Sequence, residues 1–343
     1  MSSRRPWRLA GALVLSFGLV ACGSTGPTGS TASTGSAASG GTEAGAAGTR
    51  VFTADNGDVT IPAFPKRVVA TGYAVPVLIE TGAALAGVSS WQRGLPLMTA
   101  EQRATYDNLP KIAGETAAET NYEAIAAAKP DLIVIGVPKP VLAEINLDRL
   151  KSIAPVVAIG PTTPSGWREQ SRRQADAAGR LDRFDAAKSA YEKKAAELAD
   201  KYRSALNGLR FGHVGAYGEV AKGTFHREFA GSWGTNIAQD IGVTYYGEVK
   251  KKGGGALDVT EYPSIEKLPE SLGEADAISY TVDPDGSVSE AVQYVLDSKL
   301  WKNLPAVKAG NVFPLRYTEA ATYGSALTTL DAIDRALAPL RDR

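Results

Sequence analysis

Short hydrophobic runs alternate with helix-like segments along the chain from about residue 51 onward. The runs are rich in β-branched residues and apolar on both faces, which is typical of buried parallel strands. The clearest of them is Asp131 to Val137 (DLIVIGV). The other predicted strands are 67–71, 85–88, 156–159, 209–216, 277–281 and 311–315, and the predicted helices include 73–82, 121–128, 235–241 and 325–337. This alternation predicts an α/β fold with parallel sheets covered by helices.

The stretch 166–207 has a different pattern. It is rich in Ala, Lys, Glu, Arg and Asp, with apolar positions at roughly helical spacing. It predicts one long helix or two, between Pro164 and Gly208. A chain of 343 residues also favours two domains or lobes. We therefore expect an N-terminal lobe at 51–165, a connecting helical segment at 166–207 and a C-terminal lobe at 208–343.

The N-terminus has the pattern of a secretory signal over residues 1–21. Three arginines precede a 12-residue apolar run, Leu9 to Val20, which is too short to span a bilayer. Ala21 and Cys22 follow the run, and Cys22, the only cysteine, lies in a sequence that resembles a bacterial lipobox. The alternative is an ordinary signal followed by an accidental cysteine. Of the next 27 residues, 25 are Gly, Ser, Thr or Ala, so we expect a lipidated Cys22 and a flexible tether over 22–50.

Composition and motifs argue against several function classes. Lys+Arg and Asp+Glu are both 37, a balance that argues against nucleic-acid binding. One cysteine and two histidines, His213 and His226, leave little for a metal held by the protein, so no cofactor and no metal site are predicted. The chain lacks a phosphate-binding loop, a nucleophile elbow and a His-Glu-x2-His motif. An enzyme is not expected, although an unrecognised surface enzyme based on carboxylates stays open.

Several short helix–strand junctions occur in a characteristic order along the chain. They are Phe64–Val69 with Gly72-Tyr73, Ile112–Gly114, Asn121–Ile125, Lys129–Ile133, Leu150–Val157, Leu300-Trp301, Leu304–Gly310 and Val312-Phe313. In this order they resemble iron-siderophore substrate-binding proteins of ABC importers. Thr120 stands where that family has proline. The resemblance implies a class III periplasmic-binding-protein fold, with two parallel-sheet α/β lobes joined by a single long rigid helix. It also implies a monomer that binds a ferric siderophore between the lobes.

Ligands of α/β lobes bind beyond the carboxyl ends of the strands, so the loops there supply the candidate site. A ferric chelate needs aromatic faces for its skeleton and arginines for its oxygens. The candidates from these loops are Tyr73, Trp91, Arg93, Tyr217, Arg227, Trp233, Tyr280, Arg316, Tyr317 and Tyr323. Each could instead be a core or rim residue. His213 and Trp301 are interpreted as structural.

These aromatic candidates with few arginines favour a near-neutral complex, a hydroxamate such as ferrioxamine, over a catecholate. Cobalamin or haem on the same fold is the alternative ligand, with a tyrosine or His226 as a possible haem ligand. The family resemblance also implies a role for Glu123 and Glu266, which occupy similar contexts in the two halves. They are expected to dock onto the ABC permease at the extracytoplasmic face of the cell membrane.

Overall fold

The computed structural model describes residues 48–218 and 222–341. The predicted signal, Cys22 and nearly all of the predicted tether therefore lie outside the described residues. The tether was predicted to reach residue 50, whereas a strand already begins at Thr49. This strand, β1 (Thr49–Ala54), pairs antiparallel with β2 (Gly57–Pro62). An ion pair of 2.9 Å between Arg50 and Asp176 attaches the hairpin to the helical segment that follows the lobe.

The N-terminal lobe contains the parallel sheet that the sequence predicts. Its strands lie in the order β5-β4-β3-β6-β7, and all five residues of β6 are buried. The strands are β3 (Val68–Gly72), β4 (Leu85–Ser89), β5 (Lys111–Ala113), β6 (Leu132–Gly136) and β7 (Val156–Ala158). The helices are α1 (Ala74–Glu80), α2 (Ala100–Asn108), α3 (Tyr122–Ala127) and α4 (Leu147–Lys151). The 3-10 turns are η1 (Gln92–Leu97), η2 (Ala117–Glu119), η3 (Lys139–Glu144) and η4 (Pro164–Gly166).

The C-terminal lobe has a mixed sheet of order β11-β9-β8-β12-β13, with β10 paired to β8. Strands β8, β10, β12 and β13 pair in parallel, whereas β9 and β11 pair antiparallel. The strands are β8 (Arg210–Gly215), β9 (His226–Glu228), β10 (Thr244–Tyr245), β11 (Thr260–Glu261), β12 (Ala277–Thr281) and β13 (Val312–Leu315). The helices are α7 (Asn236–Asp240), α8 (Leu268–Leu272), α9 (Glu290–Asp297), α10 (Lys299–Lys302), α11 (Pro305–Lys308) and α12 (Tyr323–Leu337), with 3-10 turns η5 (Gly255–Asp258), η6 (Ile265–Lys267) and η7 (Ala338–Leu340).

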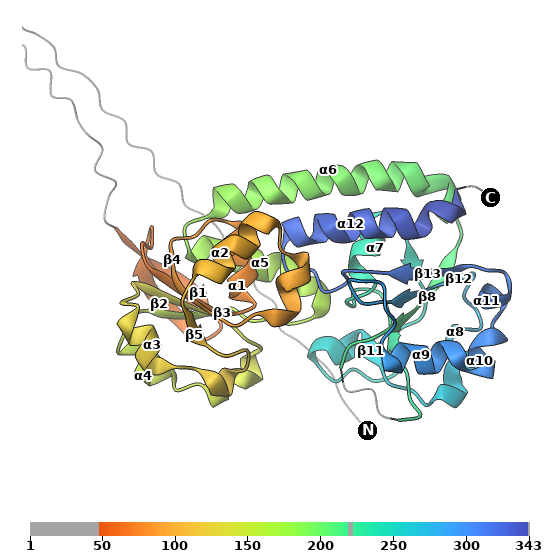
Figure 1. Ribbon diagram of the computed structural model, residues 1–343, viewed down its shortest axis with the longest axis horizontal. Helices are drawn as coiled ribbons and strands as arrows, with labels where there is room; N and C mark the ends of the chain where they lie inside the picture. The colour runs from red at the N-terminus through yellow and green to blue at the C-terminus, as the bar shows by residue number, and fades with distance from the viewer. Residues whose placement is uncertain (1–47, 219–221, 342–343) are drawn as a thin grey trace, which may run out of the picture. The chain divides into compact units, whose positions relative to one another are not determined.

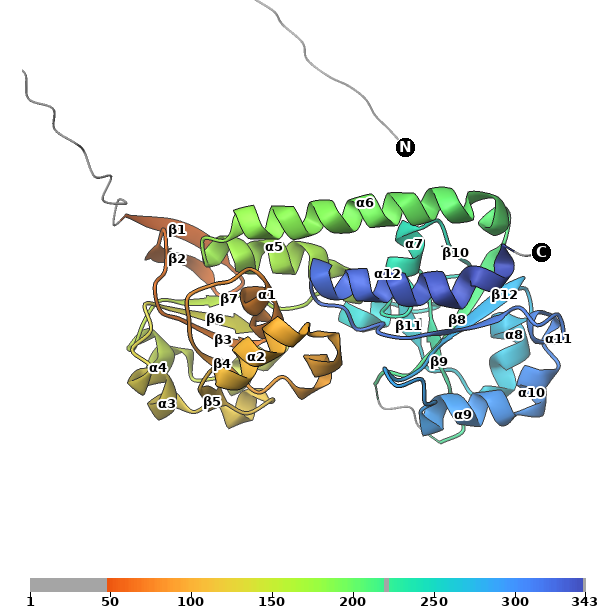
Figure 2. The ribbon, with the colours of Figure 1, turned by 45° about the horizontal axis from the view of Figure 1, so that its top comes forward.

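The segment between the lobes forms two helices, one of the two arrangements that the sequence allows. They are α5 (Trp167–Ala177) and the 26-residue α6 (Leu181–Leu206). Gly179, with φ of +66°, makes the turn between them, a conformation that glycine adopts at little cost. Helix α5 is bonded to the N-terminal lobe, since Gln174 donates to the Ile159 carbonyl at 2.8 Å. Helix α6 lies beside α12 (Figures 1 and 2), where Tyr202 donates to the Asp334 carbonyl at 2.7 Å.

One hydrophobic cluster includes residues of both lobes and of the helices that connect them. It includes Leu78 of α1, Trp167 of α5, Tyr191 of α6, and Tyr323 and Leu330 of α12. Close packing of this kind resists deformation, so it joins the lobes firmly rather than through a loose hinge. No helix within residues 48–218 and 222–341 is long and apolar enough to cross a membrane.

Candidate ligand-binding site

A cavity of about 170 Å³ lies between the two lobes. It is found beyond the carboxyl ends of β3, β4 and β6, where Tyr73, Trp91 and Pro138 follow the strands. The remaining lining comes from η1 and the segment after β7 in the N-terminal lobe, from the start of α5, and from η5 and loops of the C-terminal lobe. These residues are Arg93, Gly94, Pro161, Thr163, Pro164, Trp167, Gln170, Trp233, Ala256, Glu319 and Ala320. The cavity therefore occupies the position where α/β folds bind ligands.

The wall from the N-terminal lobe is an aromatic pair with an arginine lying over it. The rings of Tyr73 and Trp91 meet edge to face, with centroids 4.9 Å apart. The Arg93 guanidinium carbon lies 4.3 Å from the Trp91 ring centroid and 4.5 Å from that of Tyr73. Trp91 is buried, and its backbone N–H donates to the Tyr106 hydroxyl at 2.9 Å. Cation–π attraction to the buried Trp91 ring thus holds the exposed Arg93 guanidinium at the cavity.

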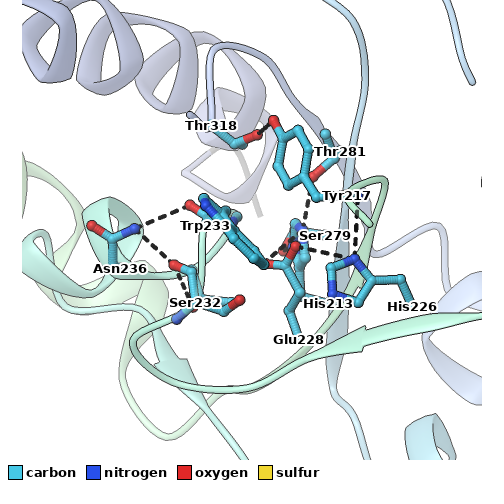
Figure 3. A network of polar contacts seen from close by, with 12 residues as sticks. His213, Tyr217, His226, Glu228, Ser232, Trp233, Asn236, Ser279, Thr281 and Thr318 are labelled. Carbon is cyan, nitrogen blue, oxygen red and sulfur yellow. Dashed lines mark hydrogen bonds and ion pairs between the residues drawn. The ribbon is translucent and has the colours of Figure 1, made fainter. Parts of the chain in front are cut away.

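The wall from the C-terminal lobe is Trp233, which lies in the loop between β9 and α7. Its ring meets Tyr217 edge to face at 5.6 Å and lies 6.1 Å from the His226 ring. The next residue, Gly234, donates its backbone N–H to the Glu228 carboxylate at 2.6 Å. Figure 3 shows Trp233 beside this group of buried polar side chains. The position of Trp233 therefore depends on a polar network rather than on an apolar core.

Glu228 is the centre of that network and is fully buried in β9. Its carboxylate oxygens lie 3.6 Å from His226 Nδ1 and 4.0 Å from His213 Nε2. Burial raises the pKa of Glu228 to about 7 and lowers the pKa of His226 to about 3. Both shifts arise because removal from water disfavours the charged form. His213 is structural, as predicted, since its ring nitrogens meet Ser279 at 2.7 Å and Thr281 at 3.1 Å (Figure 3).

Three predicted contact residues lie behind the cavity lining instead of in it, two of them buried and Tyr217 half-buried. Arg227 is 1% exposed and directs its guanidinium at the backbone carbonyls of Glu228 and Tyr246. Tyr323 packs its ring against Trp167 at 4.9 Å, within the shared core. Tyr217 supports Trp233 and bonds to the Thr318 hydroxyl. All three therefore occupy supporting positions behind the cavity wall and are not part of its lining.

Three further candidates lie away from the cavity lining. Tyr280 packs edge to face on Trp301, 6.3 Å away, and Trp301 itself is a core residue as predicted. Arg316 is exposed and lines a separate surface groove with Arg335. Tyr317 has a positive φ of 59° and accepts a hydrogen bond from Thr329 through its carbonyl. Position after a strand was therefore not sufficient to bring a side chain to the cavity.

The lining also contains residues that sequence reasoning missed. Trp167 was assigned to the connecting helix, yet its ring borders the cavity and its Nε1 donates to Asn236 at 3.0 Å. Gln170, one turn later, borders it too. Glu319 follows the predicted contact Tyr317 by two residues, but the prediction there covers only aromatic and arginine side chains. The sequence Pro-Ser-Gly-Trp at 164–167 marks the edge of the lobe, but nothing in it indicates that Trp167 borders a cavity.

The two glutamates predicted to contact a permease are both exposed. Glu123 lies in the first turn of α3, which Asn121 caps, and its carboxylate is 4.0 Å from the Arg149 guanidinium. Glu266 lies in η6. Each lobe therefore carries one of them at its surface. Within the described residues, no group of three or more His, Cys, Asp or Glu is placed to hold a metal ion.

Two lobes, a shared rigid core and an aromatic cavity at the strand ends define a substrate-binding protein. A model of the periplasmic binding protein family matches residues 69–226. A solved siderophore periplasmic binding protein from the fuscachelin gene cluster of Thermobifida fusca is 31% identical, with a TM-score of 0.64 over 81% of this chain and 98% of that one. The chain therefore belongs to the periplasmic binding protein family.

A curated relative, the iron(3+)-hydroxamate-binding protein YxeB of Bacillus subtilis, is 28% identical over 77% of each chain. The structure of SirA of Staphylococcus aureus complexed with staphyloferrin B is 23% identical, with a TM-score of 0.64 over 84% of this chain and 99% of that one. This last likeness concerns the fold alone. The predicted resemblance to iron-siderophore binding proteins and the predicted fold class are confirmed. The prediction that the chain is not an enzyme is also confirmed, since relatives and fold are those of binding proteins.

Proposed function

We propose that this protein binds a ferric siderophore in the cavity between its lobes and delivers it to an ABC importer. The observation that carries the proposal is the lining, in which three tryptophans, a tyrosine and one arginine surround the same space. Aromatic faces pack on the skeleton of a chelator, and a guanidinium fork matches its oxygens. The relatives in Bacillus subtilis and Thermobifida fusca, an iron(3+)-hydroxamate-binding protein and a siderophore-binding protein, support the same ligand class.

Among siderophores, the charge of the cavity favours a ferric hydroxamate such as a ferrioxamine. Arg93 and Glu319 carry opposite charges and line the same space. Their charges nearly cancel, so a triply anionic catecholate would gain little from the cavity while losing its hydration. A near-neutral trihydroxamate complex loses less hydration free energy when it enters the cavity.

The size of the cavity bears on how the ligand would bind. Ligand sites usually enclose roughly 300–1,000 Å³. The 170 Å³ between these lobes is smaller than that. A siderophore would therefore separate the lobes slightly or leave part of its surface in solvent. The shared hydrophobic core limits separation of the lobes, so we favour a bound siderophore with one edge exposed to solvent.

Haem is a weaker candidate on the same geometry. His226 is buried and stacks flat on Tyr262 at 4.8 Å, outside the lining. Burial raises the pKa of Tyr73, which disfavours the phenolate that would ligate ferric haem. Cobalamin and an unrecognised surface enzyme have no specific observation in their favour.

The protein would act from a lipid anchor on the extracytoplasmic face of the cell membrane, as a monomer. Cys22 would carry the acyl chains, and the Gly/Ser/Thr/Ala-rich segment behind it would let the lobes reorient. Glu123 and Glu266 would pair with basic groups of the permease. Reversing both charges to lysine should leave ligand affinity unchanged and abolish uptake by cells. Normal uptake by the double variant would remove these residues from the proposal.

The function is tested by fluorescence titration of the full chain. Trp91, Trp167 and Trp233 line the cavity, so a bound ferric chelate should quench most of the tryptophan emission. The ligands are ferrioxamine B, ferrichrome, a ferric catecholate, haem and cyanocobalamin. Saturable quenching by a hydroxamate at submicromolar concentration supports the proposal. Binding of haem or cobalamin alone would replace the ligand, and no response to any of the five would end the siderophore hypothesis.

A further inference from the structure

Glu319 supplies the one carboxylate among the described residues that line the cavity. Glu319 lies in the loop between β13 and α12. Within the described part of the chain, its side chain has neither a hydrogen-bond donor nor an ion-pair partner. Burial raises its pKa, and the charge of Arg93 opposes this shift only in part. Glu319 is half-buried, and its carboxylate is therefore available to a ligand rather than used within the fold.

The carboxylate that caps the N-terminus of α12 belongs to Glu80, not to Glu319. Glu80 of α1 accepts hydrogen bonds from the Thr322 hydroxyl at 2.5 Å and from the Gly324 N–H at 3.1 Å. It thereby satisfies the N-terminus of α12, which favours negative charge. Glu319 precedes the same helix but makes no such bond. The two glutamates differ in that one caps a helix from the other lobe and one borders the cavity.

We propose that Glu319 determines ligand specificity by binding a positively charged arm of the chelate, such as a protonated amine. The inference rests on the proposed function and narrows it to siderophores that carry a cation. An ionised carboxylate only accepts hydrogen bonds, and an ammonium group only donates them. The Trp233 ring, which borders the same space and is not covered by Arg93, also attracts a cation.

The same arrangement orients the ligand. Arg93 is held over the Tyr73 and Trp91 rings on the N-terminal side. Its guanidinium would bind the anionic hydroxamate oxygens, while the ammonium arm points to Glu319. The chelate would thus enter with its charges matched to the two walls, which gives selectivity as well as affinity.

The test compares two ligands that differ by one charge. Ferrioxamine B is a linear trihydroxamate with a free primary amine, and its N-acetyl derivative lacks that charge. The full-length wild type should bind ferrioxamine B about 10- to 100-fold more tightly, the range of a charge-assisted hydrogen bond. Glu319→Gln should lose most of that preference by weakening only the charged ligand. Glu319→Asp should retain part of it, and Glu123→Gln, a surface control, should behave like wild type.

Several results would overturn the inference, and one of them needs no variant. Equal affinity of the wild type for both ligands excludes a cation site. Equal weakening of both ligands by Glu319→Gln would mean that the carboxylate only supports the wall around Arg93. If the wild type binds neither hydroxamate, the proposed function fails first and the inference falls with it. Thermal unfolding of each variant shows whether the lobes remain folded.

Discussion

Trp91 and Trp233 face one cavity from opposite lobes, yet they are held in place by different interactions. Trp91 is part of the large apolar cluster and lies under the Arg93 guanidinium. Trp233 lies beside a buried network whose centre, Glu228, is ionisable and accepts the Gly234 N–H. The first wall should therefore be sensitive to lost volume, and the second should be sensitive to pH.

The largest loss of stability should come from removing the Trp91 ring from its apolar cluster. Trp91→Ala should lower the free energy of unfolding by about 3–5 kcal/mol, because it leaves a void in a buried cluster. Trp233→Ala, which removes a half-buried ring, should cost clearly less. Urea denaturation of both variants measures the difference. Equal losses would mean that the two walls are supported alike.

The polar network around Glu228, which supports Trp233, should make the stability of the protein depend on pH. The pKa of Glu228 is raised to about 7, so the folded protein favours its neutral form. Its contribution to stability is complete below the unfolded pKa near 4.5 and is lost as pH rises through 7. Relative to Glu228→Gln, the wild type should lose about 1–3 kcal/mol between pH 5 and pH 8.

The comparison with the variant isolates Glu228 from its neighbours. His213 and His226 have lowered pKa values, and Arg227 on the same strand remains charged at these pH values. They titrate alike in both proteins, so the difference between the two denaturation curves reports Glu228. A difference that stays constant from pH 5 to pH 8 would contradict the assignment.

Arg93 should affect binding more than stability. Its side chain is exposed but lies over two rings, so Arg93→Gln should lower the free energy of unfolding by only about 0.5–1 kcal/mol. Affinity for a ferric hydroxamate should fall about 10- to 100-fold, because charge-assisted bonds to the chelate oxygens are lost. Arg93→Lys should recover only part of this, since an ammonium lacks the planar fork. Calorimetric titration checks both, and unchanged affinity in the glutamine variant would remove Arg93 from the site.

The smallest effect concerns the contact between the lobes. Glu80→Gln should cost about 1 kcal/mol, because the N-terminus of α12 loses a charged acceptor. Glu123→Gln, at an exposed position of α3, is the matched control and should be nearly neutral. Thermal denaturation measures both variants. A neutral Glu80→Gln would show that the cap does not hold the lobes together.

The sequence predicted those parts of the fold that carry a repeating pattern. The long apolar run gave β6, and the Ala- and Lys-rich stretch gave α5 and α6. Strands β10 and β11 have two residues each, too few for any periodicity, so the mixed sheet of the C-terminal lobe was not predicted. The β1–β2 hairpin was missed for a similar reason, since it lies next to the tether.

The cavity lining was predictable only for residues that reach the cavity because they directly follow a strand. Tyr73, Trp91 and Arg93 follow parallel strands and do line the cavity. Arg227 and Tyr323 looked equivalent in sequence, but packing between distant elements buries them. Trp167 and Glu319 reach the cavity because the lobes meet there, a tertiary contact without a local sequence signal.

If the two walls together hold a ferric chelate, a crystal structure of the full chain with a ferric hydroxamate will show the iron between the Trp91–Arg93 wall and Trp233. Chelator oxygens will lie toward the guanidinium, and no protein atom will be bound to the metal. A chelate in the surface groove beside Arg316 and Arg335, or iron ligated by a protein side chain, would contradict this arrangement.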